Sequence, residues 1–172
     1  MIIALTGFPG SGKSCVGREL SALTGWPLTD LDEVVEKMAG KSVADIFADD
    51  GEEAFRQLET EALHSLDLSK NGIIALGGGS LLRPENAAIL KGKATVVWLK
   101  TTPENLMSRL VEGMSGTRPL LVGNVQGKLG NLLENRAGHY EGRADITVST
   151  DGKNPASVAR EIYSSVISSG DR

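Results

Sequence analysis

The sequence predicts an α/β fold of three layers, in which helices cover both faces of a parallel sheet. Short apolar stretches alternate with stretches of helical periodicity along the 172 residues. Residues 73–76 and 94–99 are continuous apolar runs, which is typical of strands that are buried on both faces. Residues 2–6 form a third such run, which leads directly into a glycine-rich turn and then a helix. Right-handed crossovers in such a fold place the carboxyl ends of all strands along one edge of the sheet.

Turn and capping residues set the expected boundaries. The first helix starts near Lys13 and stops at Gly25, and its core positions recur at helical spacing. Ser42 begins a capping box for a short helix that reaches residue 47, and Pro84 and Pro103 stand in the first turns of later helices. The expected strands are 2–6, 26–29, 73–76, 94–99 and 146–148, and the expected helices are 13–24, 32–39, 42–47, 52–66, 84–91, 103–111, 124–140 and one from 155.

The glycine-rich turn carries the most specific motif. Residues 7–14, G-F-P-G-S-G-K-S, match the phosphate-binding pattern G-x-x-x-x-G-K-[ST]. Glycines let backbone N–H groups surround phosphate oxygens, and the helix that follows adds its positive end. Lys13 can reach the outer phosphates, and the Ser14 hydroxyl is suited to ligate Mg²⁺. The alternative, a strand–helix turn that binds nothing, is disfavoured by the full match after a strand, so the expected phosphate contacts are Gly10, Ser11, Gly12, Lys13 and Ser14.

The composition bounds the class of protein. A 40% hydrophobic content over 172 residues suits one globular domain, and the net charge of −4 gives no electrostatic footprint for nucleic acid or an anionic membrane. The single cysteine, Cys15, excludes an intrachain disulfide, and no Cys/His cluster suggests zinc. No stretch approaches the ~18 apolar residues of a membrane span. We therefore expect a single domain over residues 1–172, a monomer in the cytoplasm, without nucleic-acid or membrane partners.

Two carboxylates follow the second expected strand. Asp30 and Asp32 lie on the same side of the chain by the two-residue period of a strand. One of them could hold Mg²⁺ through water, while the other orients a hydroxyl group or accepts its proton. The alternative is that Asp32 merely caps the next helix. Their position beside a phosphate-binding loop favours the catalytic interpretation.

Arg56 and the glycine run 77–79 each have a functional and a structural interpretation. Arg56 stands next to an apolar helix face, but from the residues alone an exposed i,i+4 pair with Glu52 is the favoured explanation. Three consecutive glycines after a buried strand suggest a close approach of the backbone to a ligand, with a merely flexible turn as the alternative.

Two more arginines are candidates for anion binding. Arg118 lies in an aperiodic, glycine-containing stretch, residues 113–123, which fits a mobile lid at about 112–124 that brings a guanidinium to a transferring phosphoryl group. The alternative is a solvated loop arginine. Arg136 lies on the inner or shoulder face of its helix, where it would need a bidentate anion partner. Ion pairs with Glu134 or Glu141 are the alternative, which helical geometry disfavours. His64 and His139 are interpreted as ordinary helix residues.

Taken in order, these elements resemble the shikimate kinase family over essentially the whole chain. The matching segments are the phosphate-binding loop, Asp30-Leu31-Asp32, the phrase S-V-A-D-I-F at 42–47, Gly51-Glu52, Phe55-Arg56, 77–79, R-P-L-L at 118–121, Arg136 before Tyr140, and Asn154-Pro155. The resemblance implies a P-loop fold of the nucleoside monophosphate kinase type with a five-stranded parallel sheet. It also implies that ATP phosphorylates the 3-hydroxyl of shikimate, with Mg²⁺ as the cofactor.

The resemblance also implies roles for the candidates, which are carried over position by position. The catalytic residues would be Lys13, Asp32 and Arg118, and shikimate would be bound by Asp32, Arg56, Gly78, Gly79 and Arg136. ATP would contact Gly10, Ser11, Gly12, Lys13, Ser14, Cys15, Arg118, Lys153 and Pro155. Mg²⁺ would be held by Ser14 and, through water, by Asp30.

Four positions depart from the family pattern. Gly138 and His139 stand where a proline and an apolar residue are frequent, Lys153 replaces an arginine, and Cys15 replaces a threonine. Two other functions remain open at this point: another small-molecule P-loop kinase, such as a gluconate kinase, and a catalytically inactive nucleotide-binding module. The absence of an N-K-x-D motif disfavours a regulatory GTPase.

Overall fold

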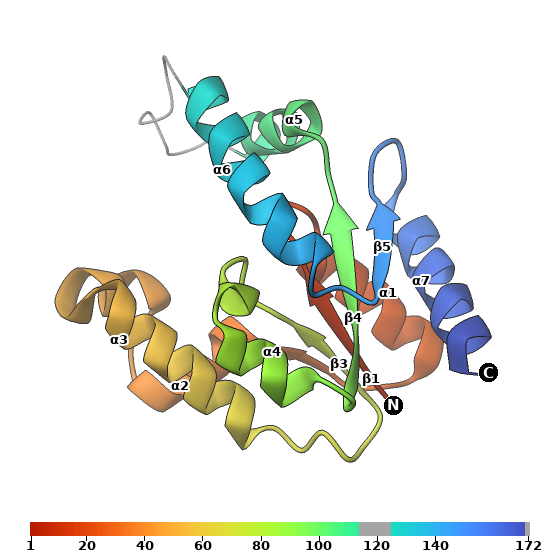
Figure 1. Cartoon of the computed structure of the whole chain (residues 1–172), viewed down its shortest axis with the longest axis horizontal. Helices are drawn as coiled ribbons and strands as arrows, with labels where there is room; N and C mark the ends of the chain where they lie inside the picture. Colours follow the sequence, from red (N-terminus) through yellow and green to blue (C-terminus); the bar gives the residue numbers. More distant parts are fainter. Residues whose placement is uncertain (114–124, 171–172) are drawn as a thin grey trace.

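The computed structural model describes residues 1–113 and 125–170, with side chains for 1–109 and 130–169 (Figure 1). Five strands form one sheet in the order β2-β3-β1-β4-β5, and every neighbouring pair is parallel. The strands are β1 (Ile2–Thr6), β2 (Leu28–Asp30), β3 (Gly72–Ala75), β4 (Ala94–Lys100) and β5 (Ile146–Ser149). The predicted three-layer fold with a five-stranded parallel sheet is therefore confirmed.

The helices fall into three groups (Figure 1). On one face of the sheet lie α1 (Lys13–Thr24) and α7 (Pro155–Gly170). On the other face lie α2 (Leu31–Ala39), α3 (Val43–Ser65) and α4 (Pro84–Leu90). Beyond the carboxyl ends of the strands lie α5 (Pro103–Gly113) and the first turns of α6 (Val125–Glu141), whose last turns return to the sheet, where Tyr140 packs against Trp98 of β4. A short 3₁₀ helix, η1 (Ser80–Leu82), precedes α4 and was not predicted.

The two cores explain why the strands read as continuous apolar runs. In β1, Ile2 and Ala4 pack into the core beneath α2, α3 and α4, whereas Ile3 and Leu5 pack into the core beneath α1 and α7. None of these four side chains is more than 4% exposed. Because successive side chains point to opposite faces of a strand, a sheet that is covered on both sides needs apolar residues at every position.

The second strand begins two residues later than expected. The end of α1 holds Trp26 in a turn, because Ser21 Oγ donates to its carbonyl at 2.6 Å and its own N–H donates to Thr24 Oγ1 at 3.1 Å. Pairing with β3 therefore starts only at Leu28, opposite Ile73.

The two helices expected on either side of Gly51 form one element, α3, which is kinked at that glycine. Gly51 has φ 85° and ψ 174°, a backbone conformation that only glycine adopts readily. Ser42 caps the first half as predicted, with its hydroxyl accepting from the Asp45 N–H at 3.1 Å. No helix in the described residues is long and apolar enough to cross a membrane.

We expect two glycine-to-alanine changes to alter stability in opposite directions. Gly51→Ala should lower the free energy of unfolding by about 1–3 kcal/mol, because alanine is strained at that φ and ψ. Gly138→Ala should raise it by about 0.5–1 kcal/mol, because Gly138 lies inside α6 and an added Cβ would meet no atom within 4 Å. Urea unfolding of both variants measures the two changes, and a loss of stability in both would contradict the helical environment of Gly138.

Candidate active site

The phosphate-binding loop joins β1 to α1 and needs glycine at several positions. Gly10 and Gly12 have φ of 89° and 94°, values that side chains with a Cβ rarely adopt. A Cβ on Gly7 would lie 2.7 Å from Ser11 Oγ and 2.9 Å from the Leu99 carbonyl oxygen. The Ser11 N–H closes the turn by donating to the Phe8 carbonyl at 2.9 Å, and Ser11 Oγ is buried without a partner.

Lys13 lies under this loop, close to the other charged groups of the site. Its Nζ donates to the carbonyls of Gly7 at 2.8 Å and Phe8 at 3.2 Å. Burial lowers the pKa of Lys13 to about 8, although Asp32 and Asp30 act in the opposite direction; Arg136 lowers it further. A bound phosphate would raise the pKa of Lys13 again, because a nearby negative charge favours the charged ammonium group.

Ser14 and Asp30 meet across the loop. Ser14 Oγ donates to Asp30 Oδ2 at 3.2 Å, and Asp30 Oδ1 accepts from the Asp32 N–H at 3.0 Å. Asp30, and not Asp32, is therefore the N-cap of α2. A hydroxyl and a carboxylate in contact suit Mg²⁺, which usually takes its remaining ligands from water and nucleotide phosphates. The described residues hold no group of three or more His, Cys, Asp or Glu that could bind a metal alone.

Asp32 carries a buried oxygen that has no protein partner. It lies in the first turn of α2, and its Oδ1 makes no hydrogen bond. Burial, followed by the negative charges of Asp30 and Glu59, raises the pKa of Asp32. A buried carboxylate without a donor is costly, so a hydroxyl group of a ligand is a fitting partner for it.

Arg56 is held in place by a carboxylate that the sequence interpretation missed. Its Nη1 lies 3.0 Å from Glu59 Oε1, and Glu59 is 0% exposed. The expected pair with Glu52 is also present, at 3.6 Å, on the exposed side. The other oxygen of Glu59, Oε2, accepts from Ser80 Oγ at 2.6 Å. A charged residue three positions after Arg56, on the buried face of the same helix, was the available signal for this contact.

The glycine run 77–79 is tightly packed between the phosphate-binding loop and α3. A Cβ on Gly77 would lie 2.6 Å from Glu59 Oε2, and one on Gly79 would lie 2.4 Å from the Arg56 guanidinium. A Cβ on Gly78 would lie 2.7 Å from Pro9. The backbone of this turn therefore lies so close to the neighbouring side chains that only glycine fits at the three positions.

Arg136 approaches the same region from α6. Its guanidinium lies over the Phe8 ring, 5.1 Å from the centroid. No carboxylate among the described side chains lies within 4.0 Å of it, so the ion pairs with Glu134 or Glu141 considered above are not formed. One turn further on, the Tyr140 hydroxyl donates to the Gly78 carbonyl. Tyr140 therefore ties α6 to the glycine turn, a role that sequence alone did not indicate.

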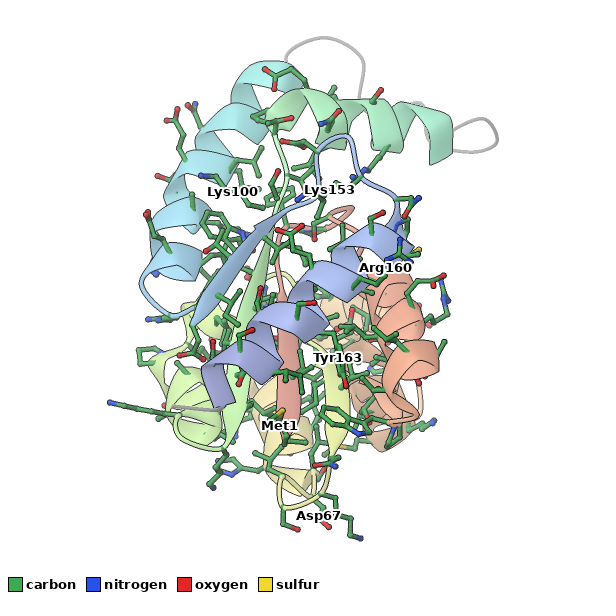
Figure 2. The ribbon with its side chains drawn as sticks, turned by 90° about the vertical axis from the view of Figure 1, so that its right-hand side faces the viewer. Met1, Asp67, Lys100, Lys153, Arg160 and Tyr163 are labelled. Carbon is green, nitrogen blue, oxygen red and sulfur yellow. The ribbon has the colours of Figure 1, made fainter. Side chains whose placement is uncertain are left out.

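A pocket of about 400 Å³ opens on the other side of the phosphate-binding loop. It is lined by Gly10, Ser11, Gly12, Cys15, Val16, Arg109, Thr150, Lys153, Pro155 and Val158. Figure 2 shows Lys153 at this end of the sheet, and its Nζ pairs with Glu161 at 2.6 Å. Arg109 was not predicted; it donates to the Gly10 carbonyl at 3.2 Å and to Thr150 Oγ1 at 3.3 Å. Its position on α5, shortly before the aperiodic stretch, gave no specific signal.

The structure thus brings Lys13, Asp30, Asp32, Arg56, Arg136 and the glycine run together at one edge of the sheet, with Lys153 and Pro155 beside the adjoining pocket. Arg118 and the expected lid, apart from residues 112 and 113 at the end of α5, lie outside the described residues.

Comparison with known proteins identifies similar chains over almost the full length. The shikimate kinase family profile matches residues 9–167. A shikimate kinase of Moorella thermoacetica is 43% identical over 93% of this chain and 91% of its own length. A shikimate kinase of Thermobifida fusca is 41% identical over 99% of this chain and 97% of its own.

Solved structures agree with this similarity. A shikimate kinase from Acinetobacter baumannii in complex with shikimate superposes with a TM-score of 0.87 at 34% identity, covering 98% of this chain and 93% of that one. A gluconokinase from Sinorhizobium meliloti superposes with a TM-score of 0.58 at 21% identity, covering 92% of this chain and 87% of that one. The gluconokinase therefore shares the fold alone.

We expect the affinity for MgADP to decrease as the pH rises through about 8. Below this pH the Lys13 ammonium is charged and attracts phosphate; above it the free protein loses that charge, because burial has lowered its pKa to about 8. The dissociation constant should increase by up to about tenfold per pH unit, as measured by calorimetric titration between pH 6.5 and 9.5. Lys13→Arg, which stays charged, is the control and should lack this inflection. A wild-type affinity that is constant up to pH 9.5 would contradict the lowered pKa.

Proposed function

The chain belongs to the shikimate kinase family, and on this basis we propose that it transfers the γ-phosphate of ATP to the 3-hydroxyl of shikimate. The products are shikimate 3-phosphate and ADP, in a step of aromatic amino-acid biosynthesis. The observation that carries the proposal is the buried oxygen of Asp32, Oδ1, which has no hydrogen-bond partner. This oxygen lies close to the glycine turn, because a Cβ added to Gly77 would be only 3.3 Å from it.

The acceptor site is proposed to consist of Asp32, Arg56, Gly78, Gly79 and Arg136. Glu59 already neutralises part of the Arg56 charge and fixes its guanidinium beside Gly79. Arg136 has no carboxylate within 4.0 Å among the described side chains. The carboxylate of shikimate would supply the missing anion, since planar guanidinium groups bind carboxylates through two hydrogen bonds.

Asp32 is proposed to orient the attacking hydroxyl and to accept its proton. Burial and the charges of Asp30 and Glu59 raise the pKa of Asp32, which makes it a stronger proton acceptor than an exposed aspartate. The hydroxyl hydrogen bond would at the same time satisfy the buried oxygen. Catalysis of this kind depends chiefly on position and charge.

Lys13 and the loop amides of Gly10, Ser11, Gly12 and Cys15 are proposed to bind the phosphates. Mg²⁺, held by Ser14 and through water by Asp30, would supply positive charge to the transferring group. Pro155 and Lys153 would border the adenine in the 400 Å³ pocket, and we add Arg109, which lines the same pocket.

Three further expectations stay proposals that rest on the sequence. Arg118 would contact ATP from a lid at about residues 112–124, and closure of that lid would exclude water as a competing acceptor. The protein is proposed to be a monomer, which sedimentation analysis can test. The cytoplasm, where ATP is available, is the proposed site of the reaction.

We expect purified protein with MgATP to release ADP in proportion to added shikimate. Gluconate, supplied at the same concentration, should give no more ADP than buffer, because its flexible chain does not match a site that fixes a carboxylate between two arginines. A coupled spectrophotometric assay of ADP release measures both acceptors. Folded protein that binds MgADP but shows no shikimate-dependent turnover would overturn the proposed function and would favour an inactive nucleotide-binding module.

Asp32→Asn should lower kcat by about 10²–10⁴-fold, because the amide cannot accept the hydroxyl proton. The affinity for MgADP, measured at pH 6.5, should change less than about threefold, because Asp32 does not belong to the phosphate-binding loop and Lys13, with a pKa of about 8, is charged at that pH. Asp67→Asn is the matched control; Asp67 lies at the far end of the sheet (Figure 2) and should leave both quantities unchanged. Wild-type kcat in Asp32→Asn would contradict the role assigned to Asp32.

A further inference from the structure

A second pocket lies at the opposite end of the sheet from the active site. We call it the basal groove; it has a volume of about 760 Å³ and lies between α4, the start of β4 and the turn that follows α6. Met1, which borders it, lies at the other end of the molecule from Lys153 and the nucleotide pocket (Figure 2). None of the residues assigned to phosphoryl transfer lines this groove.

The basal groove contains a guanidinium group with an unsatisfied donor. Arg143 lines the groove, and its Nη1 is buried without a hydrogen-bond partner. No carboxylate among the described side chains lies within 4.0 Å of Arg143. The nearby carboxylate of Asp145 instead accepts from the Val96 N–H at 2.8 Å, through Oδ2. Because buried donors are nearly always paired, the position of Arg143 calls for an acceptor from outside the chain.

The other walls define what kind of acceptor would fit. Lys91 and Lys93 stand exposed at the rim and, with Arg143, outnumber the one carboxylate of the lining, that of Asp145. Leu81, Ala88 and Val96 contribute apolar surface. The volume is within the 300–1,000 Å³ that is usual for small-molecule sites, where apolar walls carry a few well-placed polar groups.

We propose that the basal groove binds a small organic anion with an apolar body, such as an aromatic carboxylate, and that Arg143 binds its anionic group. Arginine is the side chain that suits a carboxylate best, because its planar fork matches the two oxygens. Lys91 and Lys93 attract the anion to the rim, and the apolar body lies against the α4 wall.

Two wall residues of the groove lie close in sequence to residues of the proposed acceptor site. Leu81 lies in η1, directly after the glycine run, and Arg143 follows Tyr140, whose hydroxyl donates to the Gly78 carbonyl. A ligand in the basal groove would therefore lie against two segments that adjoin the residues of the glycine turn and of Tyr140.

The test uses benzoate as the probe and benzamide as its neutral counterpart, with the full chain and backbone amide NMR as the measurement. Benzoate should shift the amide signals of Gly92, Ala94 and Gly142 in a saturable way, and benzamide should bind at least tenfold more weakly. Signals of Gly10 and Gly12 in the phosphate-binding loop, which do not line the groove, report separately on any binding at the active site. Shifts confined to that loop, or equal affinities for the two probes, would overturn the proposal.

Variants distinguish the basal groove from non-specific binding. Arg143→Gln should weaken benzoate at least tenfold, whereas Arg160→Gln, which removes a surface arginine on the outside of α7 (Figure 2), should leave the affinity unchanged. Ala88→Trp fills the groove from an exposed position on α4 and leaves Arg143 in place, so it decides the matter even if Arg143→Gln fails to fold. Wild-type affinity in Ala88→Trp would show the proposal to be wrong.

Discussion

The parallel pairing of β1 with β3 brings together the two turns around which the candidate site is built. The ladder runs from Ile2 opposite Gly72 to Leu5 opposite Ala75, and the Leu76 N–H continues it by donating to the Leu5 carbonyl at 2.9 Å. Both strands therefore end at the same level, and the phosphate-binding loop and the glycine run emerge side by side. The 2.7 Å approach of a Gly78 Cβ to Pro9 is a direct result of this register. A shift by one residue would move the phosphate-binding loop and the glycine run apart.

The charged groups around these two turns are buried in two different ways. In the first way, burial lowers the pKa of Lys13 and raises the pKa of Asp32. Each of the two side chains therefore carries its charge less readily than it would in water. The pair Arg56–Glu59 shows the other way to bury charge, with a 3.0 Å contact and a second hydrogen bond from Ser80. Buried pairs of this kind contribute little net stability, and their value here is the fixed direction of the Arg56 guanidinium.

Local patterns were sufficient to predict most of the fold. The phosphate-binding motif, the helix caps and the apolar runs depend on residues that are close in sequence, and the sheet and layers follow from them. Two details did not follow from the apolar periodicity. Asp30 caps α2, and not Asp32 as the alternative interpretation had it, because the helix starts at Leu31. The start of β2 is delayed by the hydrogen-bonded turn around Trp26.

A residue of the candidate site could be predicted only where it belongs to a recognisable sequence motif. Glu59, Arg109 and Tyr140 acquire their roles from partners 21 to 99 positions away in the chain: Ser80, Gly10 and Gly78. For Arg109 and Tyr140 a single sequence contains no signal for such pairs, since each of the two is an ordinary member of its helix. Physical reasoning could have marked Glu59 alone, because a carboxylate on a buried helix face requires a partner.

Phe8 connects the two halves of the site. Its carbonyl accepts from both Lys13 Nζ, at 3.2 Å, and the Ser11 N–H, at 2.9 Å, while its ring lies beneath the Arg136 guanidinium. A phosphate that draws Lys13 away from the carbonyl therefore acts on the same residue that supports Arg136. Leu106 of α5 and Leu133 of α6 pack with Phe8. A displacement of the Phe8 ring would therefore change the packing of both helices. The proposed nucleotide and acceptor sites thus meet at one residue, through its carbonyl and its ring, which gives a physical route by which the occupation of one site can alter the other.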